Sequence, residues 1–335
     1  TEPFSDMERP LVSAIIPVFN GARYVAQAID SVLAQSYVPI EVIAVDDGST
    51  DESSAILSRY GEKIRWIRQV NRGVGVARNR GILAAKGEYV AFLDQDDWWY
   101  PKKIERQVAA LADSGAGFVH TQAVCFDDVK QEFCPPLDPE ARPEEYVGWC
   151  FERLLFGNAI CNSSVLVRRE LFAQVGLCDP VIEGNTVQDY DLWLRLATVT
   201  PFAFVAEPLT VFRLHPHQGT VNRRMMLREQ IKVLLRRLPG LPHELRHSVT
   251  HRLARLYDLL GSYELDYHDH RAARRAFAQS FRWEPHVRSL CLWFVTFLSA
   301  GGVASLRRLY ARWKGPNDVR KEIAAPHGGN CRGNS

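Results

Sequence analysis

Strand-like apolar runs alternate with helical patterns over the first hundred residues, and this alternation constrains the fold more than any other feature of the sequence. The four runs span residues 11–18, 40–45, 64–70 and 89–93. A strand–helix–strand order predicts parallel strands joined by right-handed crossovers, with helices covering the sheet. We therefore predict an α/β fold with a mostly parallel central sheet and a ligand site at the carboxyl ends of its strands.

Acidic side chains follow two of these runs. Asp46 and Asp47 come directly after the second run, and Asp94, Asp96 and Asp97 follow the fourth. Carboxylates this close repel one another unless a cation or hydrogen-bond donors offset their charge. Oxygen-rich clusters of this kind suit Mg²⁺ or Mn²⁺, which often also bind substrate phosphates. The alternative is a solvated loop whose acidic residues cap the next helix.

The second half of the chain is organised differently. Beyond residue 115 the pattern becomes irregular, and from Asn222 onward it is all-helical. We predict a flexible N-terminus at 1–10, an α/β domain at 11–221, a helical region at 222–313 and a disordered tail at 314–335. Within the helical region, residues 242–285 fit the spacing of one tetratricopeptide-like hairpin, with an arbitrary helical tail as the alternative.

Charge and cysteine content exclude several classes of protein. Residues 222–335 carry 21 basic and 9 acidic side chains, a net charge of +12, whereas residues 1–221 have a net charge of −10. The basic part indicates contact with an anionic surface, but it lacks a motif that reads nucleic acid, so we expect no nucleic-acid partner. None of the seven cysteines forms a Cys-x-x-Cys pair, which favours reduced thiols over a zinc ribbon. Residues 1–10 lack the apolar core of a signal peptide, so we expect a cytoplasmic protein.

Six short motifs follow one another along the α/β part of the chain. They are Val12–Asn20, Val45–Asp51, Ala77–Gly81, Phe92–Asp97, Gln188–Arg195 and Phe212–His215. In this order and spacing they resemble the successive signatures of family 2 glycosyltransferases. The resemblance implies the Rossmann-like glycosyltransferase A fold, with residues 11–221 as the catalytic domain. It also implies an inverting transfer of a sugar from a nucleotide-diphosphate sugar to an acceptor hydroxyl group, in the synthesis of cell-surface polysaccharides or glycoconjugates.

The resemblance assigns roles to individual positions. Pro17, Phe19 and Asp47 match residues that line the nucleotide base and ribose, and Asp47 accepts a hydrogen bond from uracil in relatives that use UDP-sugars. The positions that complete the nucleotide-sugar site are Gly73, Arg78, Asp94 and Gln95. Asp96 matches the residue that holds Mn²⁺ or Mg²⁺ against the diphosphate, and His215 matches a position that approaches the same metal.

Asp189 matches the general base that removes a proton from the acceptor. One carboxylate within hydrogen-bond reach suffices for this step and typically contributes ~10²–10⁴-fold. The family usually has Glu where this chain has Gln188, and this loss of a neighbouring negative charge should lower the pKa of Asp189 slightly. Without the resemblance, Asp189 is equally well explained as a helix N-terminal charge favoured by the macrodipole. Asp191 is the nearest alternative base.

Two other functions fit parts of the sequence. A nucleotidyltransferase also needs a nucleotide pocket and metal carboxylates, but Asn20–Arg23 is a poor version of its Gly-rich phosphate loop. A non-catalytic sugar-nucleotide binding protein is the other alternative, against which the presence of Asp94, Asp96 and Asp189 argues. The sequence leaves the acceptor open between a saccharide and a lipid-linked saccharide.

An apolar stretch lies between Arg288 and Arg307 in the basic part of the chain. Such a stretch can lie in the interface of a membrane, with aromatic side chains at headgroup level and arginines on anionic lipid. We therefore predict peripheral contact with the inner face of a membrane. A core helix packed on the catalytic domain is the alternative.

Overall fold

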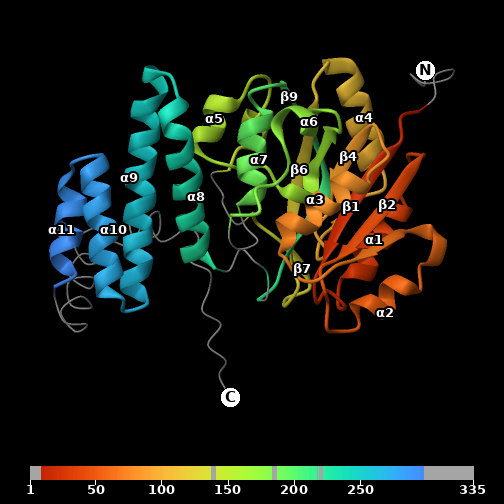
Figure 1. The fold of residues 1–335 in the computed structure, drawn as a ribbon, viewed down its shortest axis with the longest axis horizontal. Helices are drawn as coiled ribbons and strands as arrows, with labels where there is room; N and C mark the ends of the chain where they lie inside the picture. The colour runs from red at the N-terminus through yellow and green to blue at the C-terminus, as the bar shows by residue number, and fades with distance from the viewer. Residues whose placement is uncertain (1–8, 137–140, 183–186, 217, 219–221, 298–335) are drawn as a thin grey trace. The chain divides into compact units, whose positions relative to one another are not determined.

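The computed structural model describes residues 9–136, 141–182, 187–216, 218 and 222–297 (Figure 1). The chain divides into two compact units, Thr1–Gln218 and Gly219–Ser335, and each is described by itself. The predicted flexible N-terminus at 1–10 falls almost wholly outside the described residues. Residues 298–313 and the predicted tail at 314–335 fall outside them entirely.

The predicted parallel arrangement is confirmed for the first four strands. These are β1 (Val12–Val18), β2 (Ile40–Asp46), β3 (Arg65–Arg68) and β4 (Tyr89–Phe92). They pair in the order β3-β2-β1-β4, and every pair is parallel. Because β1 lies inside the sheet and all of its residues are buried, its sequence is apolar nearly throughout rather than alternating. The acidic residues after β2 and β4 therefore flank the end of β1.

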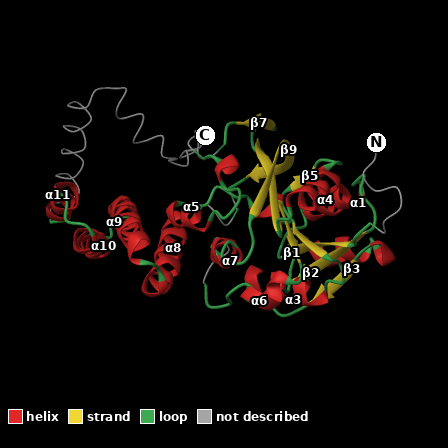
Figure 2. Ribbon diagram, turned by 90° about the horizontal axis from the view of Figure 1, so that it is seen from above, coloured by secondary structure: helices red, strands yellow, loops and turns green. Residues whose placement is uncertain are grey.

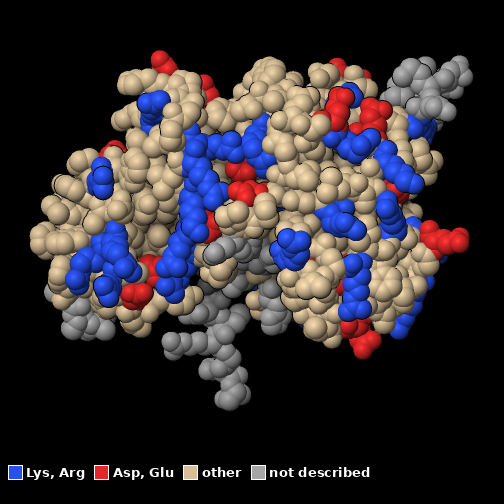
Figure 3. Space-filling model, in the orientation of Figure 1, with Lys and Arg blue, Asp and Glu red and all other residues tan. Residues whose placement is uncertain are grey.

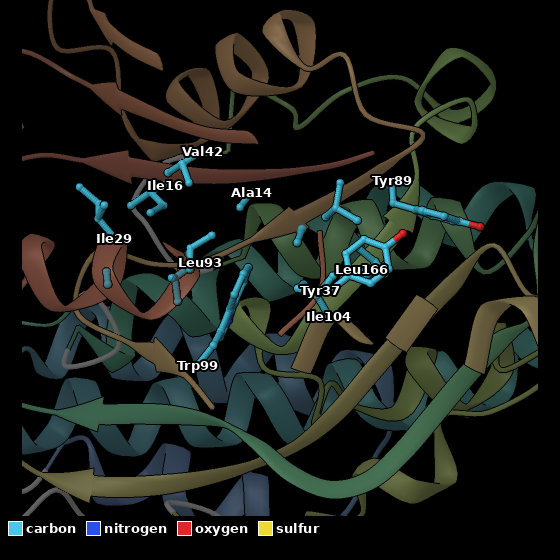
Figure 4. Close-up of a cluster of buried hydrophobic side chains, with 14 of the residues drawn as sticks. Ala14, Ile16, Ile29, Tyr37, Val42, Tyr89, Leu93, Trp99, Ile104 and Leu166 are labelled. Carbon is cyan, nitrogen blue, oxygen red and sulfur yellow. The ribbon is translucent and has the colours of Figure 1, made fainter. Parts of the chain in front are cut away.

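Helices cover both faces of this part of the sheet (Figure 2). On one face, α1 (Val25–Leu33) and α4 (Lys103–Ser114) join even-numbered residues of β1 in a buried cluster that includes Ile16, Ile29 and Ile104 (Figure 4). On the other face, α3 (Val74–Ala84) packs closely on β1. A Cβ added to Gly81 of α3 would lie 2.4 Å from Cγ2 of Ile15, so this helix comes close to the sheet because residue 81 has no side chain.

The remaining strands make the sheet mixed. β8 (Val165–Arg168) runs antiparallel to both β4 and β6 (Phe118–Asp127), and β6 pairs in parallel with β9 (Phe202–Leu214). The short strands β5 (Trp98–Trp99) and β7 (Glu132–Cys134) pair antiparallel with β9 and β6. The predicted α/β fold is confirmed, but the sheet is less parallel than its first strands indicated because β8, between β4 and β6, runs antiparallel to both. The long strand β9 was not predicted, since Glu207 and Pro208 interrupt its apolar pattern at the point where its register with β6 shifts.

Shorter elements connect these strands. They are α2 (Ser53–Ser58), α5 (Phe151–Phe156), α6 (Leu171–Val175), α7 (Gln188–Leu196) and the 3₁₀ turns η1 (Gly61–Lys63), η2 (Pro143–Glu145) and η3 (Asn162–Ser164). Two of them bear on function: α7 carries Asp189 at its start, and η3 lies next to the end of β4.

The second unit is helical in its described part. It contains α8 (Arg223–Arg237), the 3₁₀ turn η5 (Leu238–Gly240), α9 (His243–Asp266), α10 (His270–Trp283) and α11 (Val287–Val295). α9 and α10 form a hairpin with Phe277 buried against Gly261, where a Cβ would lie 2.7 Å from the Phe277 ring. The tetratricopeptide likeness of this hairpin stays a prediction. Lys and Arg side chains gather over α8, α9 and α10 on the face drawn in Figure 3. None of the helices within residues 9–297 that the structure describes has the length and apolarity to span a bilayer.

Candidate active site

Asp47 joins the end of β2 to the loop that precedes α3. Its Oδ1 accepts hydrogen bonds from the Gln69 side-chain amide (2.7 Å) and the Arg72 main-chain N–H (2.9 Å), and its Oδ2 accepts one from the Gly73 N–H (2.8 Å). Gly73 has a φ of +90°, which favours glycine, and it immediately precedes the first turn of α3. A carboxylate has about four acceptor sites, so Asp47 retains about one for a ligand. Its predicted contact with a nucleotide base thus competes with its role in shaping this loop.

Gln95 joins the loop after β4 to the loop after β1. Its Oε1 accepts from the Phe19 N–H (2.9 Å), and its Nε2 donates to the Phe19 carbonyl oxygen (3.1 Å). The Phe19 side chain is 42% exposed, and Pro17 is buried within β1. The structure therefore brings Phe19 and Gln95, two of the predicted nucleotide-sugar positions, into contact. Both functional atoms of the Gln95 amide, however, bind main chain, so this side chain fixes the loop.

Asp94 is held on one side by two donors. Its Oδ1 accepts from Arg78 Nη2 (2.7 Å) and from Asn162 Nδ2 (3.0 Å), while its main-chain N–H donates to Ser163 Oγ (3.0 Å). Arg78 is buried, and burial disfavours its charge, but Asp94, followed by Cys178 and Asp189, keeps the pKa of Arg78 above its ordinary value. The charge of Arg78 thus interacts with both predicted site carboxylates, Asp94 and Asp189.

Asp97 is separated from its neighbours by burial. It is 2% exposed, its Oδ2 accepts from Ser163 Oγ (2.5 Å), and its Oδ1 accepts from the Arg213 main-chain N–H (2.9 Å). Burial raises the pKa of Asp97 well above its usual range, and the charges of Asp96 and Asp94 add to this effect. Three carboxylates follow β4 in the sequence. In the structure, Asp97 is buried and binds protein donors on both of its oxygens, so it is not available to a ligand.

Asp96 and His215 form a pair although they are far apart in the sequence. His215 Nε2 lies 2.9 Å from Asp96 Oδ2, and the two side chains are 7% and 22% exposed, respectively. The strand β9 brings His215 to this point, and the ring of Tyr24 lies 4.9 Å from the His215 ring. Over the part of the chain that the structure describes, no group of three or more His, Cys, Asp or Glu side chains is arranged to hold a metal ion. The contact therefore brings together one carboxylate and one imidazole.

Asp189 lies in the first turn of α7, where its Oδ1 accepts from the Tyr190 N–H (2.7 Å). Burial raises the pKa of Asp189 to about 6, although the Arg78 guanidinium opposes this shift. The effect of burial on the pKa of Asp189 is thus larger than the small decrease expected from having Gln188 in place of Glu. The alternative base, Asp191, is engaged by Arg195, whose Nη2 lies 2.9 Å from Asp191 Oδ2.

Several residues that shape this site were missed from the sequence. Arg213 and Asp128 form a buried ion pair (2.6 Å) beside the loop after β4, and Asn162 and Ser163 hold that loop from η3. Arg213 stands in the motif Phe212–His215, which was a usable signal. Nothing local marks the other three residues.

A cavity of about 600 Å³ lies elsewhere in the first unit. It is lined by Glu145, Val147, Trp149, Cys150, Glu152, Arg153 and Phe156. None of the predicted site residues lines it, so its volume gives no information about the chemistry at the sheet edge.

Comparison with known proteins identifies relatives of the chain. Residues 13–174 match the family model described as glycosyl transferase family 2. An uncharacterized glycosyltransferase of Rickettsia prowazekii is 38% identical over 223 residues, which are 66% of this chain and 69% of the relative. A second, from Rickettsia felis, is 38% identical over 63% of this chain, which spans 35% of that longer protein. TuaG of Bacillus subtilis, named for teichuronic acid biosynthesis, is 34% identical over 56% of this chain and 72% of its own length.

Solved structures share the fold. Staphylococcus aureus TarS superimposes with a TM-score of 0.62 at 16% identity, over 84% of this chain and 50% of TarS. A shorter form of TarS has been solved with UDP and with UDP-GlcNAc. A mannosyltransferase from Pyrobaculum calidifontis, solved with GDP-Man and Mn²⁺, superimposes with a TM-score of 0.57 at 19% identity, over 95% of this chain and 86% of the mannosyltransferase.

Proposed function

Because the chain belongs to glycosyl transferase family 2, we propose that it is an inverting enzyme that moves a sugar from a nucleotide diphosphate to an acceptor hydroxyl group. One observation carries this proposal: Asp189, Arg78 and Asp94 form one electrostatic group, and Asp94 lies in the same loop as Asp96, which pairs with His215. A carboxylate of raised pKa beside donors for an anionic leaving group is the combination that sugar transfer needs.

The donor in this proposal is a nucleotide-diphosphate sugar, and a UDP-sugar is the first choice. The ligands of the fold relatives, UDP, UDP-GlcNAc and GDP-Man, support this class. Base and ribose would lie along Pro17, Phe19, Asp47 and the loop at Gly73. Asp94, held by Arg78 and Asn162, would face the ribose and the donor sugar.

Asp96 and His215 fit a divalent cation. A carboxylate oxygen suits Mg²⁺ and Mn²⁺, and an imidazole nitrogen is acceptable to Mn²⁺. The buried Nδ1 of His215 has no hydrogen-bond partner within the described residues, so the ring is not committed to a second protein group. When bound, the cation would neutralise the negative charge that develops on the departing diphosphate. The mannosyltransferase with Mn²⁺ supports this part of the proposal.

Asp189 would act as the general base. With a pKa of about 6 it is largely ionised at neutral pH. As the acceptor oxygen attacks the anomeric carbon from the face opposite the diphosphate, a new C–O bond forms, the bond to the phosphate oxygen breaks, and the hydroxyl proton passes to Asp189. Attack from the opposite face inverts the anomeric configuration. The helix α7 fixes the carboxylate on a rigid element, which favours proximity.

The acceptor in this proposal is a saccharide or a lipid-linked saccharide of a cell-surface polymer. The name of TuaG supports a role in polysaccharide synthesis. Family membership argues against the nucleotidyltransferase alternative, and the non-catalytic alternative is settled by assay.

That assay uses purified protein, Mn²⁺ and a panel of UDP-, GDP- and dTDP-sugars, scored for slow hydrolysis of the donor. We expect hydrolysis of one class of donor, abolished by Asp96→Asn and unaffected by Asp113→Asn, a matched change at an exposed carboxylate of α4. Proton NMR of the released sugar at early times gives the anomeric outcome. Binding of a donor without turnover of any kind would favour a non-catalytic protein.

We also propose peripheral contact of the second unit with an anionic membrane. Its exposed apolar side chains on and after α11 support this contact, since Val287, Leu290, Phe294 and Phe297 are 76%, 42%, 59% and 54% exposed. Basic residues near an anionic surface contribute about 1 kcal/mol each. Flotation with anionic vesicles should be weakened by salt and by Phe294→Asp, but not by Leu83→Asp at an exposed position of α3. Equal failure of all proteins to float would contradict the proposal.

A further inference from the structure

Arg213 is a buried arginine near the C-terminal end of β9. It is 5% exposed, and its guanidinium carbon lies 4.7 Å from the centre of the Tyr24 ring and 4.5 Å from that of Trp98. Its charge is balanced by Asp128, which is also buried, at a distance of 2.6 Å between Nη1 and Oδ1. A buried ion pair is costly to form unless its remaining donors and acceptors are satisfied. The donors of Arg213 are satisfied in a way that involves the candidate site.

Two of those donors bind the loop after β4. The Nε of Arg213 donates to the main-chain carbonyl oxygen of Asp96 (2.8 Å), and its main-chain N–H donates to Asp97 Oδ1 (2.9 Å). His215 follows the end of β9, and like Arg213 it contacts both Asp96 and the ring of Tyr24. His215 contacts the carboxylate of Asp96 (2.9 Å) while Arg213 holds the backbone of the same residue.

The two terminal nitrogens of the Arg213 guanidinium bind residues outside the loop after β4. Its Nη2 donates to Gln27 of α1, and Asp128 also accepts from the Tyr24 hydroxyl group (2.9 Å) and from Arg23 Nη2 (2.7 Å). The Tyr24 ring contacts both the Arg213 guanidinium and the His215 ring. These contacts therefore connect α1, the end of β6 and the loop after β4.

We propose that Arg213 is a positioning residue that sets the distance and orientation of the Asp96–His215 pair, and thereby the affinity of the site for its divalent cation. The inference rests on the function proposed above. Arg213 touches neither metal nor substrate in this assignment; it acts through the backbone of Asp96. Its three side-chain nitrogens donate in three directions, to Asp96, Asp128 and Gln27. Lysine carries its donors on one nitrogen and cannot reproduce this planar fork.

The test compares Arg213→Lys and Asp128→Asn with Arg195→Lys. Arg195 is a matched control because it too is an arginine of the first unit with a largely buried side chain, which is 15% exposed. Like Arg213, it donates to one carboxylate, that of Asp191, and to main-chain carbonyl oxygens, those of Val175 and Leu177. Electron paramagnetic resonance measures free Mn²⁺ during titration of each protein in the presence of UDP. Hydrogen–deuterium exchange of peptides that cover residues 93–99 reports the order of the loop without metal. Thermal unfolding of each variant reports the cost to stability.

We expect Arg213→Lys and Asp128→Asn to weaken Mn²⁺ binding by at least about tenfold, the usual effect of losing a partner behind a metal ligand. Exchange of the 93–99 peptides should rise, and the apparent KM for Mn²⁺ should rise more than kcat falls at saturating Mn²⁺. Arg195→Lys should leave Mn²⁺ affinity and exchange of the 93–99 peptides unchanged, even where it lowers Tm by a similar amount.

Mn²⁺ affinity and loop exchange at wild-type levels in a folded Arg213→Lys or Asp128→Asn protein would overturn the inference. If Arg213→Lys does not fold, Asp128→Asn alone decides. Failure of the proposed function is recognised separately: wild-type protein would then bind no Mn²⁺ with UDP. A loop still loosened by Arg213→Lys would in that case support the positioning role, and an unchanged loop would overturn it.

Discussion

Lowering the pH of the transfer assay tests the role of Asp189, because burial raises the pKa of its carboxyl group to about 6. The Arg78 guanidinium lowers this pKa and so limits the shift. The ionised carboxylate is the form that accepts the proton of the acceptor hydroxyl group. The rate should therefore rise with pH through the pKa and be lost as the pH falls below it.

The size of the effect follows from the fraction of carboxylate. A group with a pKa of about 6 is about 90% ionised at pH 7, half ionised at pH 6 and about 10% ionised at pH 5. The kcat/KM for the acceptor should accordingly fall about tenfold between pH 7 and pH 5. An ordinary aspartate, with a pKa of about 3.9, would still be about 90% ionised at pH 5, and the rate would hardly change.

The assay follows release of the nucleoside diphosphate at saturating donor and Mn²⁺, across pH 5 to pH 8. The donor itself should not contribute to this limb of the profile, since a diphosphate diester lacks the second ionisation near pH 6 of a phosphate monoester. Asp189→Asn serves as the control, because its residual rate should not follow the same limb. A flat profile down to pH 5, or the same limb in Asp189→Asn, would refute the assignment of Asp189 as a base of raised pKa.

Three further changes test other parts of the structure. Asp96→Asn should abolish divalent-dependent turnover while Tm stays near that of the wild type, because the carboxylate lies on a loop beyond β4; wild-type activity that survives excess EDTA would contradict the metal site. Asp189→Asn should lower kcat by ~10²-fold or more with little effect on nucleotide affinity measured by calorimetry, since the proton is removed only in the transition state. Gly81→Ala should lower the free energy of unfolding by about 1–3 kcal/mol in urea melts because its Cβ would meet Ile15 at 2.4 Å, whereas Leu83→Ala, at an exposed position of the same helix, should cost less than about 0.5 kcal/mol.

Much of the first unit could be predicted because its signals are local. The four parallel strands follow from short apolar runs, and the position of the site follows from the rule that parallel strands end at one edge. The same rule brought the residue after β2, Asp47, and the residues after β4, Asp94 and Asp96, to one edge before any pairing was known. Strand and helix periods are properties of neighbouring residues, so they can be read without knowing the rest of the chain.

The strand β9 shows where local signals fail. Its apolar pattern is interrupted at Glu207 and Pro208, and its partner β6 shifts register there to accommodate them. A bulge of this kind is stabilised by the neighbouring strand rather than by its own sequence. The resemblance placed His215 near the metal of Asp96, but only the pairing of β9 shows how His215 and Arg213 reach the loop after β4.

Tertiary structure decided the hydrogen-bond partners and the burial of each carboxylate of that loop. The resemblance distinguished Asp94 from Asp96, but it gave no role to Asp97, which is buried on Ser163, 66 residues away, and it gave no partner atom for Asp96, which meets His215, 119 residues away. The raised pKa of Asp189 is likewise a consequence of burial, which no spacing along the chain encodes. The sequence determined the first four strands and the edge of the sheet at which the acidic residues after β2 and β4 meet, because strand formation depends on local periodicity. The partners and solvation of each charge were decided by which distant strands lie side by side, since the energy of a carboxylate depends on the donors and the water around it and not on its neighbours in the chain.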